Sequence, residues 1–266
     1  MALDDGEALF ERYLKARAYG ILAYHPDLGT PKRPDYLISD GHRQVVVEVE
    51  SFNRPPLSVD HLRNGCVSMV PQLKAVRNKI TAGAKQLKGI ENYPLVVVLA
   101  NPRNSWVPLE GAMFLGALFG DMQYSFLSNG EGILRAGRNG RLYVAEPDGS
   151  THGNHPYLSA VAVLRLCYSQ DAWGAAMSKA QEIRYTHPLA VIREANRLVT
   201  KYDETAVEGI CLDVYETVSK LAVPLPRDIF DGPEDTRWGV TAVGEYDQID
   251  RPPDRKIIMW PFPENV

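Results

Sequence analysis

The chain reads Arg33-Pro34-Asp35-Tyr36-Leu37-Ile38 and, after a short polar turn, Val45-Val46-Val47-Glu48-Val49-Glu50-Ser51-Phe52. These apolar and β-branched residues predict two strands, over 36–39 and 44–52, joined by a turn at Asp40-Gly41. Because side chains alternate along a strand, Glu48 and Glu50 share one face. If the two strands pair, Asp35 approaches Glu48. Converging carboxylates of this kind suit a hard cation such as Mg²⁺.

An amphipathic edge strand is the alternative interpretation of the second stretch. Its valines would face the core and its two glutamates would face water. The functional interpretation rests on the free-energy cost of burying a carboxylate without a cation or hydrogen-bond donors.

A helix is predicted over residues 4–17, because Asp4 or Asp5 can cap it and its apolar residues recur at helical spacing. Glu7 lies within the apolar stripe, three residues before Phe10. An acid that points toward the core needs a partner or a metal ion. Alternatively, Glu7 only occupies the helix start, where the helix dipole favours an acid.

A second helix is predicted over residues 72–88, which hold five bases and no acid: Lys74, Arg77, Lys79, Lys85 and Lys88. Most such charges form a solvated face, but surface helices usually mix signs because i,i+4 ion pairs stabilise them. The apolar run 94–100 is typical of a buried strand. Further along, the pattern predicts a short helix over 110–119, a hairpin within 123–146, a buried strand over 159–168, and helices over 171–182 and 204–221.

The order of these elements resembles the PD-(D/E)XK nuclease superfamily. The matching residues are Glu7, Pro34-Asp35, Glu48-Val49-Glu50, Ala84-Lys85-Gln86-Leu87 and Val96-Val97-Val98, all within residues 4–102. Position 50 departs from the family, which usually has Lys there. Some members carry Glu at this position and still cut DNA, some have the lysine on the following helix, and others have lost activity. The second case nominates Lys79 or Lys85.

The resemblance implies an α/β fold with a restriction-endonuclease-like core, in which helices flank a central mixed β-sheet. It implies that Asp35 and Glu48 bind Mg²⁺ or Mn²⁺, that Glu50 accepts a proton or binds a second cation, and that Glu7 and Gln86 assist. The implied reaction is hydrolysis of phosphodiester bonds in nucleic acid, with DNA as the expected substrate. Side chains expected to hold backbone phosphates are Lys32, Arg33, Lys74, Arg77, Lys79 and Lys88.

Two other functions stay open. A catalytically inactive nuclease fold that binds nucleic acid or protein is favoured by Glu50 in place of Lys. Residues 203–254 hold thirteen acids against four bases, so this region would alternatively imitate DNA or contact a basic partner. A homodimer is a further expectation, since an enzyme that cuts both strands often works as a dimer.

The expected organisation is a nuclease-like domain over residues 1–200, with an acidic C-terminal helix and an irregular extension over 201–266 packed on it. The first residues show no apolar signal core, and the apolar run 112–119 is too short to span a bilayer. Cys66, Cys167 and Cys211 are odd in number and widely spaced. They predict reduced thiols, a cytoplasmic location and no membrane contact.

Overall fold

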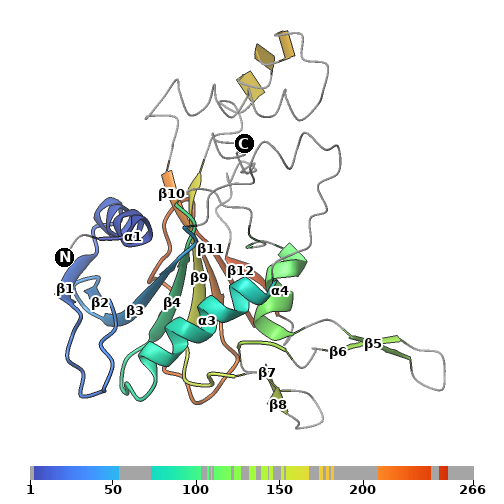
Figure 1. Ribbon diagram of the computed structural model, residues 1–266, viewed down its shortest axis with the longest axis horizontal. Helices are drawn as coiled ribbons and strands as arrows, with labels where there is room; N and C mark the ends of the chain where they lie inside the picture. The colour runs from blue at the N-terminus through green and yellow to red at the C-terminus, as the bar shows by residue number, and fades with distance from the viewer. Residues whose placement is uncertain are drawn as a thin grey trace.

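The architecture is a mixed β-sheet with helices packed on it, as seen in a computed structural model (Figure 1). The structure describes residues 3–53, 73–102, 107, 109, 111–120, 123–126, 132–135, 139–142, 144–145, 151–152, 154–167, 174–175, 178–179, 181–182, 209–240 and 246–250. Within these residues the helices are α1 (Asp5–Ala16), α3 (Leu73–Leu87) and α4 (Gly111–Phe119).

Eight strands form the main sheet in the order β1-β2-β3-β4-β9-β10-β11-β12. Their bounds are β1 (Gly20–Tyr24), β2 (Tyr36–Ser39), β3 (Gln44–Ser51), β4 (Leu95–Ala100), β9 (Ala160–Cys167), β10 (Gly209–Glu216), β11 (Thr236–Val240) and β12 (Tyr246–Asp250). Strands β3, β4 and β9 run parallel, whereas β1, β2 and β3 pair in antiparallel fashion. The expected α/β class with a central mixed sheet is therefore confirmed.

Two small antiparallel ladders lie outside the main sheet (Figure 1). One joins β5 (Gln123–Phe126) to β6 (Gly132–Arg135), and the other joins β7 (Val144–Ala145) to β8 (Thr151–His152). The hairpin expected within 123–146 is thus confirmed at β5 and β6.

The core has two layers because alternate residues of the strands point to opposite faces of the sheet. One layer joins α1 to the odd-numbered valines of β3, Val45, Val47 and Val49. The other joins α3 and α4 to Val46 and to the facing residues of β4 and β9. Glu48 and Glu50 have the same parity as Val46, so they lie on the face covered by α3.

The expectation of a helix over 204–221 is wrong for residues 209–221, the part of this range that the structure describes. Residues 209–216 form β10, which pairs with β9 on one side and β11 on the other. Leu212 and Val214 fill one core layer while Cys211 and Tyr215 are buried on the other side. Burial on both faces and pairing with two neighbours override the weak helical pattern of this segment. Of the helix expected over 171–182, residues 174–175, 178–179 and 181–182 are described, and they are helical as expected.

Strands β11 and β12 join the same sheet, so the described part of residues 201–266 is not an irregular extension. Five of its acids have hydrogen-bond or ion-pair partners within the chain. Tyr13 Oη donates to Asp235 Oδ2 at 2.6 Å, in the interior. Ion pairs also join Asp213 to Arg165, Asp228 to Arg43, Glu234 to Arg17, and Glu216 to Arg237. These five acids are thus engaged by other side chains of the same molecule.

Cys211 takes part in a disulfide, so the expectation of a reduced thiol is wrong for this residue. Among the described residues, no helix combines the length and the apolar character that a membrane crossing requires.

Candidate metal centre

The hairpin of β2 and β3 brings Asp35 and Glu48 together. Tyr36 pairs with Val47 in the antiparallel β2–β3 ladder. Asp35, one residue before Tyr36, therefore lies beside Glu48, one residue after Val47. The backbone N–H of Asp35 donates to Glu48 Oε2 at 3.2 Å, and the backbone N–H of Val49 donates to Asp35 Oδ2 at 2.8 Å. Each carboxylate therefore accepts a hydrogen bond from the backbone of the facing segment, and the expected approach of Asp35 to Glu48 is confirmed.

Glu48 is only 6% exposed, and β3 lies between β2 and β4. The alternative of an edge strand with both glutamates in water is therefore excluded for this residue. Burial, followed by the negative charges of Asp35 and Glu50, raises the pKa of Glu48 to about 9. Burial also raises the pKa of Asp35 to about 6, although the Val49 hydrogen bond opposes this shift. The pair carries less negative charge at neutral pH than two free carboxylates would.

Glu50 meets a lysine from the following helix. Lys79 Nζ lies 2.8 Å from Glu50 Oε2. The close approach of α3 to β3 requires glycine at position 83, because a Cβ there would lie 2.9 Å from Val97 Cγ1 and 3.3 Å from Glu50 Cγ. Of the two lysines nominated from the sequence, Lys79 is thus the one in contact with this strand.

Lys85 and Gln86 lie further along α3. Lys85 is exposed, and its charge contributes to lowering the pKa of His155 at the loop before β9. Gln86 is half-buried, one helical turn beyond Gly83 and so on the same side of the helix. The structure therefore separates Lys85 from the carboxylates and leaves Gln86 on the side of the helix that faces β3.

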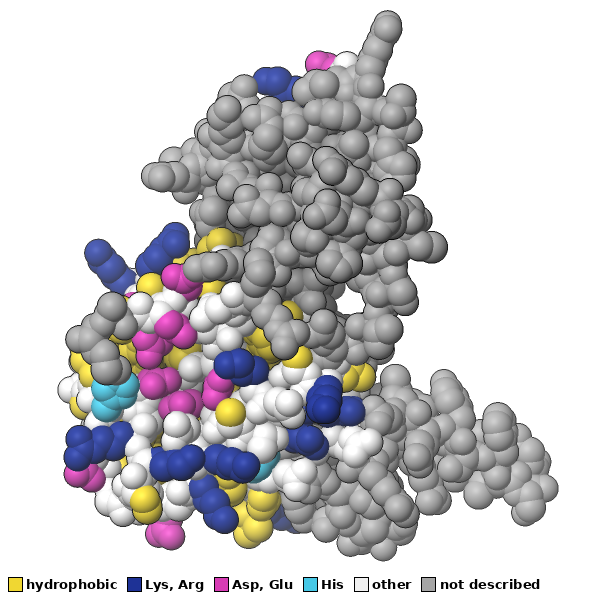
Figure 2. Space-filling model, in the orientation of Figure 1, with side chains coloured by type: hydrophobic (Ala, Val, Ile, Leu, Met, Phe, Trp, Pro, Cys, Tyr) yellow, Lys and Arg dark blue, Asp and Glu magenta, His cyan; other side chains and the backbone are white. Residues whose placement is uncertain are grey.

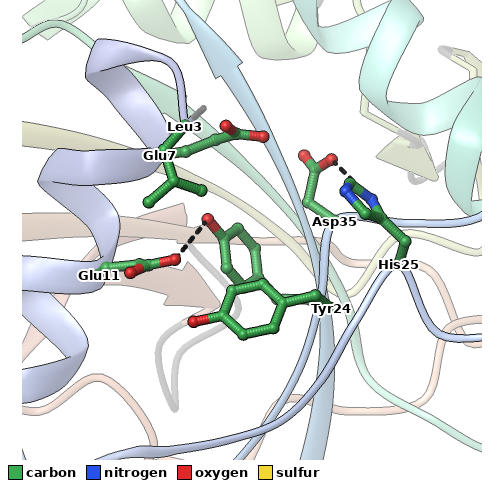
Figure 3. A pocket seen from close by; sticks show the side chains of 7 residues that line it. Leu3, Glu7, Glu11, Tyr24, His25 and Asp35 are labelled. Carbon is green, nitrogen blue, oxygen red and sulfur yellow. Dashed lines mark hydrogen bonds and ion pairs between the residues drawn. The ribbon is translucent and has the colours of Figure 1, made fainter. Parts of the chain in front are cut away.

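Glu7 has two roles in the structure. It completes a capping box at the start of α1, where its Oε2 accepts from the backbone N–H of Asp4 at 2.8 Å. Its carboxylate also faces Asp35 across a pocket, as Figure 3 shows, and its charge contributes to the raised pKa of Asp35. Glu7 therefore caps the helix start, as the alternative interpretation expected, and also lies near Asp35.

The pocket has a volume of about 400 Å³ and is lined by Leu3, Glu7, Glu11, Tyr24, His25, Asp35 and Tyr36. His25 follows β1, and its Nδ1 lies 3.9 Å from Asp35 Oδ1. Its φ of 46° is uncommon for a residue other than glycine, and such backbone strain is often found at functional sites. Its backbone N–H donates to the Asp35 carbonyl at 2.9 Å, which fixes the position.

Sequence reasoning missed His25, Tyr24 and Glu11. The first two become neighbours of Asp35 only through the pairing of β1 with β2, where Tyr24 lies opposite Tyr36. Glu11 carried a signal, since it lies four residues after Glu7 on the same helix and therefore on the same side.

The residues expected to hold phosphates have different environments. Lys32, Lys74 and Lys88 are exposed, whereas Arg33 pairs with Asp27 at 3.1 Å. Arg77 Nη2 donates to the Gly116 carbonyl in α4 at 2.9 Å, so it also joins two helices. Figure 2 shows acidic side chains gathered on one face, with lysine and arginine side chains around them.

The donor set fits a magnesium-type cation better than a transition metal. Within the described part of the chain, no group of three His, Cys, Asp or Glu side chains is close enough to hold one ion together. Mg²⁺ is commonly bound by one or two carboxylates, with water and substrate phosphates completing its shell. Asp35 and Glu48 could supply these two carboxylates, and a cation there would offset the cost of burying their negative charge.

Comparisons of the chain with protein-family models, curated proteins and solved structures find no match.

Proposed function

We propose that the chain is a metal-dependent nuclease that hydrolyses phosphodiester bonds of nucleic acid, with DNA as the expected substrate. The observation that carries the proposal is the pair of Asp35 and Glu48, oriented by backbone N–H groups, whose pKa values are raised chiefly by burial and further by neighbouring carboxylates. Strongly raised carboxyl pKa values in a cluster beside a pocket are typical of functional sites. The arrangement of α1, β2, β3, α3 and β4 is compatible with a restriction-endonuclease-like core.

In this proposal Asp35 and Glu48 hold Mg²⁺ or Mn²⁺. When bound, the cation lowers the pKa of a coordinated water and stabilises the charge of the transition state. Glu50 would accept a proton from the attacking water or bind a second cation, and Glu7 would orient water from the far side of the pocket. Lys79, next to Glu50, would place its charge where the family usually has the lysine of the strand.

The first test is calorimetric titration of Mn²⁺ into the wild type and Asp35→Ala, with cleavage assays on plasmid and single-stranded DNA. Loss of both binding and cutting in the variant supports the proposal. Lys79→Ala should lower the cutting rate by roughly 10²–10³-fold, as expected for removal of a group that stabilises transition-state charge. Lys85→Ala is the matched control, because it removes an exposed lysine from the same helix.

A catalytically inactive nuclease fold that binds nucleic acid or protein is the second candidate, favoured by Glu50 in place of Lys. Absence of Mn²⁺ binding by the wild type would refute the nuclease and favour this candidate. The role of residues 203–254 as a mimic of DNA receives less support, because five of their acids are engaged inside the fold.

A further inference from the structure

The pocket has an aromatic wall beside its carboxylates. Glu7 faces Asp35, Leu3 lies beside Glu7, and Tyr24 and Glu11 line the remaining part (Figure 3). Leu3 is 45% exposed and Tyr24 is 54% exposed, so both can be reached from solvent. Ligand pockets commonly have volumes of roughly 300–1,000 Å³, so about 400 Å³ is enough for a small ring system.

One side of the Tyr24 ring packs against a second tyrosine, Tyr36. Its ring lies 5.6 Å from that of Tyr36, centroid to centroid, at an interplanar angle of 58°. Tyr36 is 1% exposed and is fixed in turn by an edge-on contact with Phe10 and by a hydrogen bond from its hydroxyl to Glu11 Oε1 at 3.4 Å. An aromatic ring that is braced on one side and exposed on the other is a stacking platform.

Glu11 supplies an acceptor next to this platform. Partial burial, and then the negative charge of Glu11, raises the pKa of the Tyr24 hydroxyl, which places the carboxylate close to both tyrosines. An ionised carboxylate has about four lone-pair positions, so it can accept further hydrogen bonds. Acidic side chains accept hydrogen bonds from the exocyclic amino groups of nucleobases such as the N4 amine of cytosine.

We infer that this end of the pocket binds one unpaired nucleobase, stacked on Tyr24 and donating its exocyclic amino group to Glu11. The inference rests on the proposed nuclease function and names its substrate as single-stranded or frayed nucleic acid. The lining is acidic, so it disfavours a phosphate but accepts a neutral ring that carries N–H donors. A base within a duplex is stacked and paired, so it must leave the helix to reach Tyr24. The neighbouring phosphate would then lie toward the cation that is proposed at Asp35 and Glu48, which would offset the repulsion from the carboxylates.

The test is fluorescence-detected binding of the single-stranded hexanucleotides dA6, dC6 and dT6 in Ca²⁺ buffer, chosen to avoid cleavage during the measurement. The wild type should bind dA6 and dC6 more tightly than dT6, because thymine has no exocyclic amine. Tyr24→Ala should weaken binding of all three by roughly 5- to 150-fold, the range for loss of one stacked base. Glu11→Gln should reduce the preference for dA6 and dC6 over dT6. Leu22→Ala is the matched control, since it removes an exposed apolar side chain from the same strand outside the pocket lining.

Equal affinities of Tyr24→Ala and Leu22→Ala would overturn the inference. So would binding of arginine amide that depends on Tyr24 while no hexanucleotide binds, because the pocket would then accept a cationic side chain. The binding measurement does not require turnover, so it separates this inference from the nuclease proposal. Hexanucleotide binding that depends on Tyr24, without cutting in Mg²⁺ or Mn²⁺, would retain the base site and reject the nuclease.

Discussion

Glu48→Gln is expected to stabilise the fold while removing metal binding. The pKa of Glu48 is about 9, against an ordinary value of 4.5, because the side chain is buried beside Asp35 and Glu50. Between these two values the folded protein holds a proton that the unfolded chain has released. Proton uptake on folding then costs stability, whereas glutamine is neutral in both states. The glutamine carbonyl can still accept the hydrogen bond from the Asp35 backbone.

The magnitude follows from the pKa difference. Below pH 4.5 Glu48 is protonated in both states, so the cost is absent. It grows as pH rises toward about 9 and then levels off, by at most about 1.4 kcal/mol per pH unit. At pH 7 the upper bound is about 3 kcal/mol, and we expect a gain of about 1–3 kcal/mol in the free energy of unfolding of Glu48→Gln.

The assay is urea unfolding of both proteins between about pH 5 and about pH 8, with and without Mn²⁺. Without metal, the stability advantage of the variant should grow with pH. Mn²⁺ should stabilise the wild type and leave Glu48→Gln unchanged, because binding to the folded state alone adds stability. Asp40→Asn is a control of opposite sign. The pKa of Asp40 is lowered to about 2, chiefly by the backbone N–H of Arg43, so loss of its charge should destabilise the fold at neutral pH.

Parallel stability profiles of the wild type and Glu48→Gln across this pH range would refute the reasoning. Such a result would mean that Glu48 ionises freely in the folded protein, and that its burial does not hold a proton in place.

Three further predictions concern the metal and the packing of α1. Mn²⁺ affinity, measured calorimetrically, should rise about tenfold per pH unit between pH 6 and 9, with release of one proton. The reason is that binding must displace the proton of Glu48. A pH-independent affinity would contradict this prediction. Tyr13→Phe should lower the free energy of unfolding by about 1–3 kcal/mol in denaturant melts, because Asp235 loses a buried donor; an unchanged midpoint would show that the bond contributes nothing. Gly6→Ala should lower the free energy of unfolding by about 1–3 kcal/mol, because its Cβ would lie 1.9 Å from Ser51 Oγ. Adding Ser51→Ala to this variant should restore part of the lost stability. An unchanged stability of Gly6→Ala would disprove the close contact.

The stretch from Tyr36 to Ser51 could be predicted from the sequence because alternation along a strand is a local property. The pairing register then placed Asp35 beside Glu48, as expected. The sequence also identified α1, α3 and β4 through apolar stripes and runs that stand out from their surroundings. These elements depend little on distant parts of the chain.

The parts that could not be predicted depend on distant partners. Strand β1 has no buried position and therefore no distinctive apolar pattern, so the pocket residues Tyr24 and His25 stayed unassigned. Strand β10 gains its conformation from β9 and β11, which flank it on both sides. The sequence nominated two lysines of one helix, Lys79 and Lys85. In the structure the helix packs closely on β3 at Gly83, and Lys79 is the one that pairs with Glu50.

The contacts between α1 and the C-terminal part of the chain affect the order in which the fold forms. Helix α1, which carries Glu7 and Glu11, is joined to residues more than 200 positions away through Tyr13 with Asp235 and Arg17 with Glu234. Contacts of such large sequence separation form late and slow the folding of a domain, because the loop entropy must be lost before they form. During synthesis, these contacts cannot form until Glu234 and Asp235 have left the ribosome. We therefore expect α1 to reach its final packing only after that point.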